Sequence, residues 1–185
     1  MISRQLRRET GSSMHKIRLS GKCIKDSTVD GPGLRIVVWT QGCLHNCEGC
    51  HNPNTHDVFG GFLEDIDNVI KYISDSKIQK GITLSGGEPF LQPKELIPIA
   101  RTALDKGMNV WAYSGYTYEQ IIADNEMKAL LDVIDVLVDG PFVLSLKDSR
   151  LVYKGSKNQR IIDVKRSLKE NKVILSQYDE INAEI

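Results

Sequence analysis

The chain has no excess of charge of either sign, since 24 lysines and arginines balance 24 aspartates and glutamates over 185 residues. A broad basic face for nucleic acid is therefore not expected. The sequence also lacks a run of about 18 apolar residues, which a membrane helix needs, and an apolar stretch near the N-terminus, which a secretory signal needs. Internal repeats and low-complexity segments are missing as well. We therefore expect one cytoplasmic domain with no membrane or nucleic-acid partner.

Cysteine is scarce too, with four residues, and three of them lie in the segment QGCLHNCEGCHNP, at Cys43, Cys47 and Cys50. So few cysteines in so tight a group argue against a disulfide framework and indicate metal binding in a reducing compartment. Iron–sulfur clusters are normally held by four thiolates. Three ligands suit three irons of a 4Fe-4S cube and leave the fourth iron free to bind a substrate.

A zinc site is the alternative that this segment leaves open. His45, His51 and His56 each lie near enough in the sequence to complete a Cys₃His set. The fourth cysteine, Cys23, lies in a strand-like segment well upstream, and we interpret it as a buried free thiol.

Strand-like and helix-like patterns alternate between these features. Helical spacing of apolar residues predicts helices over 66–73 and 96–104, the second ending at Gly107, and Thr117 with Gln120 forms a capping box for a third. Buried strands are predicted for the runs LRIVVWTQG, GITLS, MNVWAYS, VIDVLVD and RIIDV. Alternation of this kind implies parallel strands, but the chain is short for eight units. We therefore predict an α/β fold, a partial (β/α) barrel that is open on one side.

This domain is expected to span residues 15–175. Residues 1–14 are rich in arginine and serine and have no apolar periodicity, which predicts a disordered extension. A transit peptide has a similar composition, although nothing else in the chain points to an organelle. Residues 176–185 are polar and acidic, and we expect a solvated tail there.

Parallel α/β sheets bind ligands at the carboxyl ends of their strands, and the distinctive motifs follow strands. The cysteine segment follows LRIVVWTQG, and the pair Gly86-Gly87 follows GITLS. Ser114 follows NVWAY, and Asp139 follows VIDVLV. We expect these residues to meet at one edge of the sheet.

Together, DSTVDGPGLRIVVWTQGC and GITLSGGEPF resemble the radical S-adenosylmethionine (SAM) enzymes, whose signature is three cysteines spaced as they are here. The DGPG at Asp30 to Gly33, followed by Arg35, resembles the activases of glycyl radical enzymes. The segments WAYSGYTYE, VDGPF and YKGSKNQRIIDV look like the activating proteins of anaerobic ribonucleoside-triphosphate reductases. The resemblance runs from about Lys16 to Lys165 and implies a partial barrel of the radical SAM type.

The resemblance implies that Cys43, Cys47 and Cys50 ligate one 4Fe-4S cluster and that SAM chelates the fourth iron through its amino and carboxylate groups. An electron from the cluster then cleaves SAM to methionine and a 5′-deoxyadenosyl radical. This radical takes a hydrogen atom from a glycine of the reductase and so forms the glycyl radical. A flavodoxin or ferredoxin is the implied electron donor.

The resemblance also implies two groups of contacts to SAM. Gly86 and Gly87, preceded by Ser85, let the backbone approach the methionine part, and Glu88 accepts a hydrogen bond from the amino group. The other implied contacts are Gly49 and His51 on the adenine side and Ser114 and Asp139 at the ribose or carboxylate. GGEP as an ordinary turn, His51 as a packing residue, and Ser114 and Asp139 as helix caps remain open.

Other residues are candidates for the partner surface. DGPG and Arg35 are expected to shape the surface that receives the glycine loop, although DGPG is also a common turn sequence. Asn158, Gln159 and Arg160 could orient SAM or the partner, or make ordinary surface hydrogen bonds. Trp39 and Trp111 are expected in the core. Two other functions stay open: activation of a different glycyl radical enzyme, such as pyruvate formate-lyase, and a zinc-binding interaction module.

Overall fold

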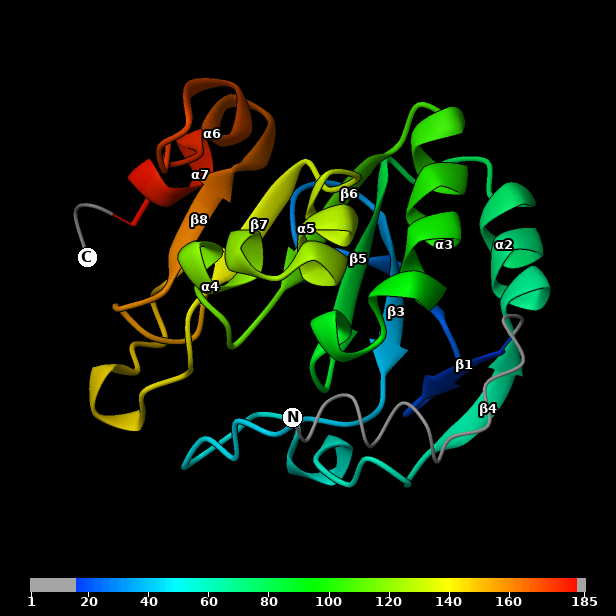
Figure 1. Cartoon of the computed structure of the whole chain (residues 1–185), viewed down its shortest axis with the longest axis horizontal. Helices are drawn as coiled ribbons and strands as arrows, with labels where there is room; N and C mark the ends of the chain where they lie inside the picture. The colour runs from blue at the N-terminus through cyan, green and yellow to red at the C-terminus, as the bar shows by residue number, and fades with distance from the viewer. Residues whose placement is uncertain (1–15, 183–185) are drawn as a thin grey trace.

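The fold is built around one eight-stranded sheet in a computed structural model that describes residues 16–182 (Figure 1). The strand order is β4-β1-β3-β5-β6-β7-β8, and β2 pairs with β3. The strands are β1 (Lys16–Leu19), β2 (Ile24–Ser27), β3 (Arg35–Thr40), β4 (Phe62–Asp65), β5 (Gly81–Gly86), β6 (Asn109–Tyr113), β7 (Val136–Asp139) and β8 (Arg160–Asp163).

The helices account for the direction of the central strands. They are α2 (Ile66–Ser74), α3 (Pro93–Asp105), α4 (Tyr118–Ala123), α5 (Asn125–Leu131), α6 (Val164–Glu170) and α7 (Gln177–Glu180), with short 3₁₀ turns η1 (Pro53–Thr55), η2 (Pro89–Leu91) and η3 (Leu144–Leu146). Strands β3, β5, β6 and β7 are parallel, and helices connect each to the next. Since β4 and β8 end the strand order without pairing to each other, the predicted open α/β sheet is confirmed.

The expectation of parallel pairing is wrong for the last strand. β8 runs antiparallel to β7, with Leu137 opposite Ile162. The connection over 140–159 contains only η3 and no crossover helix, so the chain returns along the edge of the sheet in the opposite direction. β1, β2 and β4 also pair antiparallel, at the other side of the sheet.

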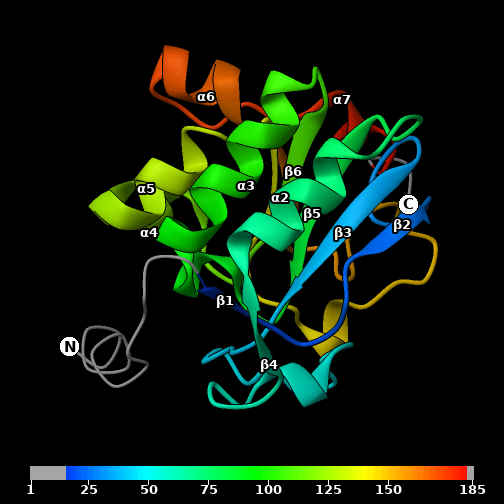
Figure 2. The same cartoon turned by 90° about the vertical axis from the view of Figure 1, so that its right-hand side faces the viewer.

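One face of the sheet carries the main core. Alternate residues of the central strands, such as Ile36, Val38 and Leu84, are fully buried against the helices. Figure 2 shows α2, α3, α4 and α5 on this side of the sheet and the gold-coloured 140–159 loop on the other. The predicted helical periodicities are confirmed, since Ile66, Val69 and Ile73 of α2 are buried.

The predicted stop of α3 and the predicted cap of α4 are confirmed, whereas α3 begins at Pro93, before the predicted first residue Leu96. α3 ends at Asp105, followed by Gly107 with a left-handed φ of 75°. At α4, the Thr117 side chain accepts from the Gln120 N–H and the Gln120 side chain accepts from the Thr117 N–H, which is the expected capping box.

The second face of the sheet carries a smaller aromatic cluster. Trp111, Val138 and Ile161 are buried there, with Tyr153 and Tyr178 packed against them. The ring centroids of Trp111 and Tyr178 are 5.3 Å apart. Trp111 is therefore a core residue, as expected.

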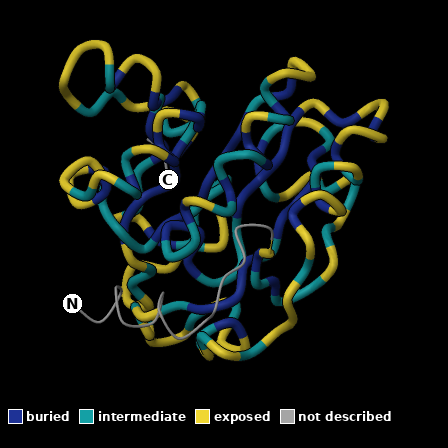
Figure 3. The backbone as a smooth tube through the Cα atoms, turned by 45° about the vertical axis from the view of Figure 1, so that its right-hand side comes forward, coloured by how far each residue is buried: buried dark blue, intermediate teal, exposed yellow. Residues whose placement is uncertain are grey.

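The C-terminal segment does not match the expected solvated tail. Within residues 176–182, Tyr178 packs on the second face and Asn182 is buried, with its side chain bonded to the backbone of Val152. Figure 3 shows the dark blue, buried strands enclosed by exposed loops. The expected extension over 1–14 lies outside the described residues. Within 16–182, no helix combines the length and apolar character required to cross a membrane.

Candidate functional site

The cysteine segment begins where β3 ends, at the carboxyl edge of the parallel strands. Its backbone is fastened to the segment that follows it: Gly42 N–H donates to Thr55 O at 2.8 Å, and Cys43 N–H donates to His56 O at 3.2 Å. The Gln41 side chain adds a hydrogen bond to Asp57 O at 2.7 Å. The loop is therefore held at its base, and its thiols lie above the edge of the sheet.

All three thiols of the loop are partly exposed. Burial raises the pKa of Cys43 to about 11, so metal binding there must displace a proton from the thiol. Gly49 has a left-handed φ of 70°, which a glycine adopts without strain and which turns the chain toward Cys50. The Asn52 N–H points at the Cys50 sulfur, 3.4 Å away.

The GGEP segment is bonded directly to the base of this loop. Gly87 N–H donates to Thr40 O and Glu88 N–H donates to Gly42 O, both at 2.8 Å. A Cβ on Gly86 would lie 2.5 Å from Thr40 O, and one on Gly87 would lie 2.4 Å from Gly42 O. Both glycines are thus required for the two motifs to approach each other, so GGEP is more than an ordinary turn.

Glu88 is the polar centre of the site, with 1% exposure. Its Oε1 accepts from Phe90 N–H at 3.0 Å and from Ser114 Oγ at 2.9 Å. Its Oε2 accepts from Gly115 N–H at 2.8 Å and pairs with His45 Nε2 at 3.1 Å. The carboxylate therefore ties together the cysteine loop, the GGEP segment and the loop after β6.

His51 packs against the long 140–159 loop. Its ring centroid lies 4.9 Å from that of Phe142, and a Cβ on Gly155 would come within 3.0 Å of His51 Cε1. Next to it, a Cβ on Gly49 would lie 2.9 Å from Leu144 Cδ1. The 140–159 loop thus closes against the cysteine segment and forms a side wall of the site, an arrangement that sequence patterns did not reveal.

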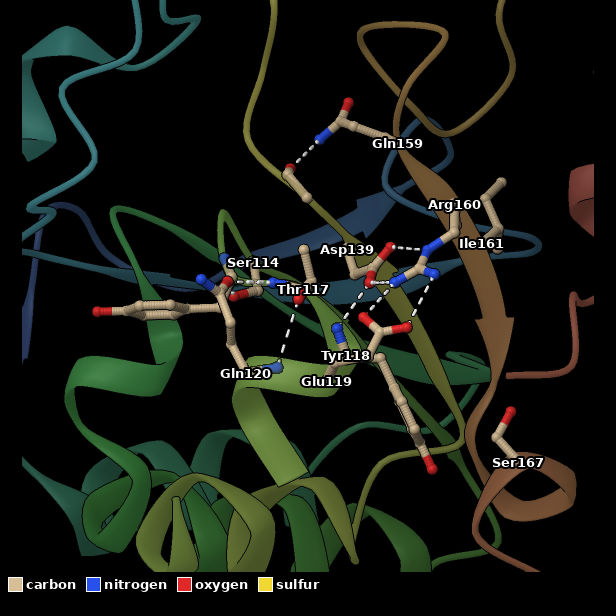
Figure 4. A network of polar contacts seen from close by, with 12 residues as sticks. Ser114, Thr117, Tyr118, Glu119, Gln120, Asp139, Gln159, Arg160, Ile161 and Ser167 are labelled. Atoms are coloured by element: carbon tan, nitrogen blue, oxygen red, sulfur yellow. Dashed lines mark hydrogen bonds and ion pairs between the residues drawn. The ribbon is translucent and has the colours of Figure 1, made fainter. Parts of the chain in front are cut away.

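Asp139 is buried at the end of β7, and its oxygens are already engaged (Figure 4). They accept from Arg160 Nε at 3.0 Å, Arg160 Nη2 at 2.5 Å and Tyr118 N–H at 2.7 Å. Arg160 also donates to Glu119, and these hydrogen bonds lower the pKa of Glu119 to about 2. The structure favours the helix-end role of Asp139 over a ligand contact.

Ser114 likewise acts within the protein, since its Oγ donates to Glu88 and accepts from Tyr116 N–H at 3.0 Å. Gln159 and Asn158 hold the base of the 140–159 loop: Gln159 Nε2 donates to Gly140 O at 3.1 Å, and Asn158 Nδ2 donates to Pro141 O at 2.7 Å. Glu119 is the network member that sequence reasoning missed; its position in the first turn of α4 was the available signal.

Comparison with known proteins places these features in one family. A family model described as a 4Fe-4S single cluster domain matches residues 29–162. The anaerobic ribonucleoside-triphosphate reductase-activating protein of Escherichia coli K12 is 38% identical over 140 residues, which cover 71% of this chain and 89% of that protein. Proteins of the same name from Haemophilus influenzae and phage T4 are 35% and 36% identical, over 72% of this chain and 90% and 86% of theirs.

The chain belongs to the anaerobic ribonucleotide reductase-activating protein family. Among solved structures, QueE from Escherichia coli is similar over 58% of this chain and 59% of its own, at 14% identity. Its TM-score of 0.47 is too low to bear on fold or function.

The donor chemistry of this activating-protein chain suits a 4Fe-4S cluster, because its loop offers three free thiols and the matching family model describes a 4Fe-4S domain. Within residues 16–182, no three His, Cys, Asp or Glu side chains converge on one point that could hold a metal ion. Of the three nearby histidines, His45 pairs with Glu88 and His51 packs against Phe142, whereas the buried Nε2 of His56 has no hydrogen-bond partner among the described residues.

The second face of the sheet offers polar groups beside this site. Ser85 is half-buried, opposite Trp39 in the strand register. The Trp39 Nε1 atom is buried, and within the described chain it has no hydrogen-bond partner. Because a buried unpaired donor is costly, this indole suits a site that receives a polar ligand. Trp39 was expected only in the core.

Arg35 lies at the opposite end of the sheet, which corrects the expectation that it shapes the partner surface. It begins β3, in register with Gly81 at the start of β5, and its side chain is fully buried. The guanidinium donates to Thr83 Oγ1 and Asn109 Oδ1, both at 2.7 Å. A buried side chain at the amino ends of the strands stabilises the fold and cannot contact a partner.

Proposed function

We propose that this chain generates the glycyl radical of an anaerobic ribonucleoside-triphosphate reductase by reductive cleavage of SAM. The observation that carries the proposal is the bonded junction of the two motifs: Gly87 and Glu88 donate to Thr40 and Gly42, directly below the three cysteines. This junction holds a binding segment for an amino acid group beside a three-thiolate cluster site. The match to relatives that carry the reductase in their names supports this partner.

Three groups of residues carry the cluster, the SAM site and the positioning of that site. Cys43, Cys47 and Cys50 would hold the cluster as its three protein ligands. Gly49, Cys50, His51, Ser85, Gly86, Gly87 and Glu88 form the SAM site. Ser114 and Asp139 position this site from behind, Ser114 through Glu88 and Asp139 through α4.

A 4Fe-4S cluster, when bound, supplies the low-potential electron that reductively cleaves SAM. Gly86, Gly87 and Glu88 would bind the methionine part of SAM, and the 140–159 loop would form the side wall of the site. A hydrogen atom passes from the glycine Cα of the reductase to a carbon of SAM, which yields methionine, 5′-deoxyadenosine and the glycyl radical. A flavodoxin or ferredoxin is the proposed source of the electron.

Anaerobic reconstitution tests this function. The protein should carry about four irons and four sulfides per chain, and with SAM, a low-potential reductant and the reductase it should produce 5′-deoxyadenosine and a doublet radical resonance. Cys43→Ala, Cys47→Ala and Cys50→Ala should each lose the cluster and the radical. Cys23→Ala is the matched control and should keep both.

Stoichiometric zinc without sulfide would contradict the proposal. Radical formation on pyruvate formate-lyase but not on the reductase would keep the chemistry and replace the partner.

A further inference from the structure

The carboxylate of Glu88 is saturated with hydrogen bonds in the structure. A carboxylate offers about four lone-pair sites on its two oxygens. Glu88 fills them with Phe90 N–H, Ser114 Oγ, Gly115 N–H and His45 Nε2, at 2.8 to 3.1 Å. A ligand amino group can bond to this carboxylate only if one of these donors leaves.

His45 is the donor that can leave. Two of the other donors are backbone amides, which move only with their chain segments. Ser114 is buried, and its Oγ also accepts from Tyr116 N–H. The His45 side chain is 19% exposed, makes the longest of the four contacts, and belongs to a loop above the sheet edge. Its replacement by a ligand needs only a side-chain rotation.

The surroundings of His45 are shaped for a ring lying across this position. A Cβ on Gly115 would lie 2.4 Å from His45 Cδ2, so only a glycine there admits the imidazole. The ring also meets Tyr116 edge-on, at a centroid distance of 4.4 Å. The imidazole is thus held on Glu88 by a hydrogen bond and against Tyr116 by an aromatic contact. Both contacts can break without a change in the backbone.

We infer that His45 is a placeholder on Glu88, which the amino group of SAM displaces when it binds. The inference rests on the proposed SAM site. Because His45 lies between Cys43 and Cys47, its release links occupation of the site to the conformation of the cluster loop. His45 is a positioning residue in this scheme, since it acts through Glu88.

Removal of the His45 imidazole should tighten SAM binding, because SAM no longer has to break the hydrogen bond between His45 and Glu88. We expect His45→Phe, which keeps a ring against Tyr116 but lacks the donor, to bind SAM about tenfold more tightly in the reduced cluster-loaded protein. His45→Gln keeps an N–H donor and should stay within about twofold of the unaltered protein. The cluster signal in electron paramagnetic resonance, titrated with SAM, measures both.

A double-mutant cycle separates this role from a structural one. In a Glu88→Ala background, His45→Phe should leave the SAM affinity unchanged, whereas damage to the cysteine loop would weaken binding in both backgrounds. His45→Leu is a second donor-free variant, expected to tighten binding equally if His45→Phe does not hold its cluster. Weaker or unchanged binding in the donor-free variants overturns the inference. If SAM fails to bind the unaltered protein, or Glu88→Ala binds it equally well, the proposed SAM site fails instead.

Discussion

The guanidinium of Arg35 lies 5.4 Å from the centre of the Trp111 ring, at the amino ends of the parallel strands. Burial lowers the pKa of Arg35 to about 10, so it remains charged at neutral pH and depends on its hydrogen bonds. The Arg35 side chain joins β3 to β5 through Thr83 and to β6 through Asn109 and Trp111. These contacts lie at the end of the sheet opposite the candidate site.

Replacement of Arg35 should therefore reduce stability rather than partner recognition. Arg35→Ala leaves Thr83, Asn109 and the Ile82 carbonyl without their donor in a buried site, which should cost about 3 kcal/mol. Denaturant unfolding measures this loss. Arg101→Ala, on the exposed face of α3, is the control and should change stability by less than about 0.5 kcal/mol. A stable Arg35→Ala protein that activates the reductase poorly would restore the partner role.

Gly87 should not tolerate a side chain. In Gly87→Ala the new methyl group would meet the Gly42 carbonyl at 2.4 Å, so the base of the cysteine loop must shift. We expect a loss of about 1 to 3 kcal/mol in stability, together with reduced iron content after reconstitution. Gly21→Ala is the matched control, because nothing lies within 4 Å of the added methyl group. Full iron content in Gly87→Ala would show that the junction tolerates movement.

The two ion pairs of Arg160, with Asp139 and with Glu119, should contribute different amounts to stability. Arg160→Ala leaves Asp139, at 1% exposure, buried without its partner, and should cost about 3 kcal/mol. Glu119→Gln removes the other partner, but Glu119 is 57% exposed, so the loss should stay below about 1 kcal/mol. Thermal unfolding of both variants shows whether Arg160→Ala is the more destabilising of the two. Because Arg160→Ala removes both ion pairs, equal losses in the two variants would mean that the buried pair with Asp139 contributes nothing to stability.

Cys23 should react slowly with thiol reagents in the cluster-loaded protein. Burial raises its pKa to about 11, so the reactive thiolate fraction at pH 8 is on the order of a hundredfold below that of an unperturbed cysteine. Since the thiolate forms as pH rises toward that pKa, the rate should increase about tenfold for each pH unit between about 8 and 10. Ellman's reagent follows the reaction, with Cys23→Ser as the blank. Rapid labelling that does not change with pH would show an exposed thiol.

Local patterns in the sequence determined much of this protein. The helical periodicity of α2 and α3 and the capping box of α4 depend on residues a few positions apart. They were therefore correctly predicted without a fold. The order of strands and motifs also placed the cysteine loop and GGEP at one edge, because parallel strands share the edge at which they end.

Only the tertiary structure decided which partner each polar residue has. Glu88 is bonded to His45 and Gly115, Asp139 to Arg160, and Arg35 to Thr83 and Asn109, all across long sequence separations. The direction of β8 and the packing of Tyr178 on Trp111 likewise depend on how the 140–159 loop crosses the sheet. These contacts arise from the meeting of distant segments, so no periodicity or local spacing records them.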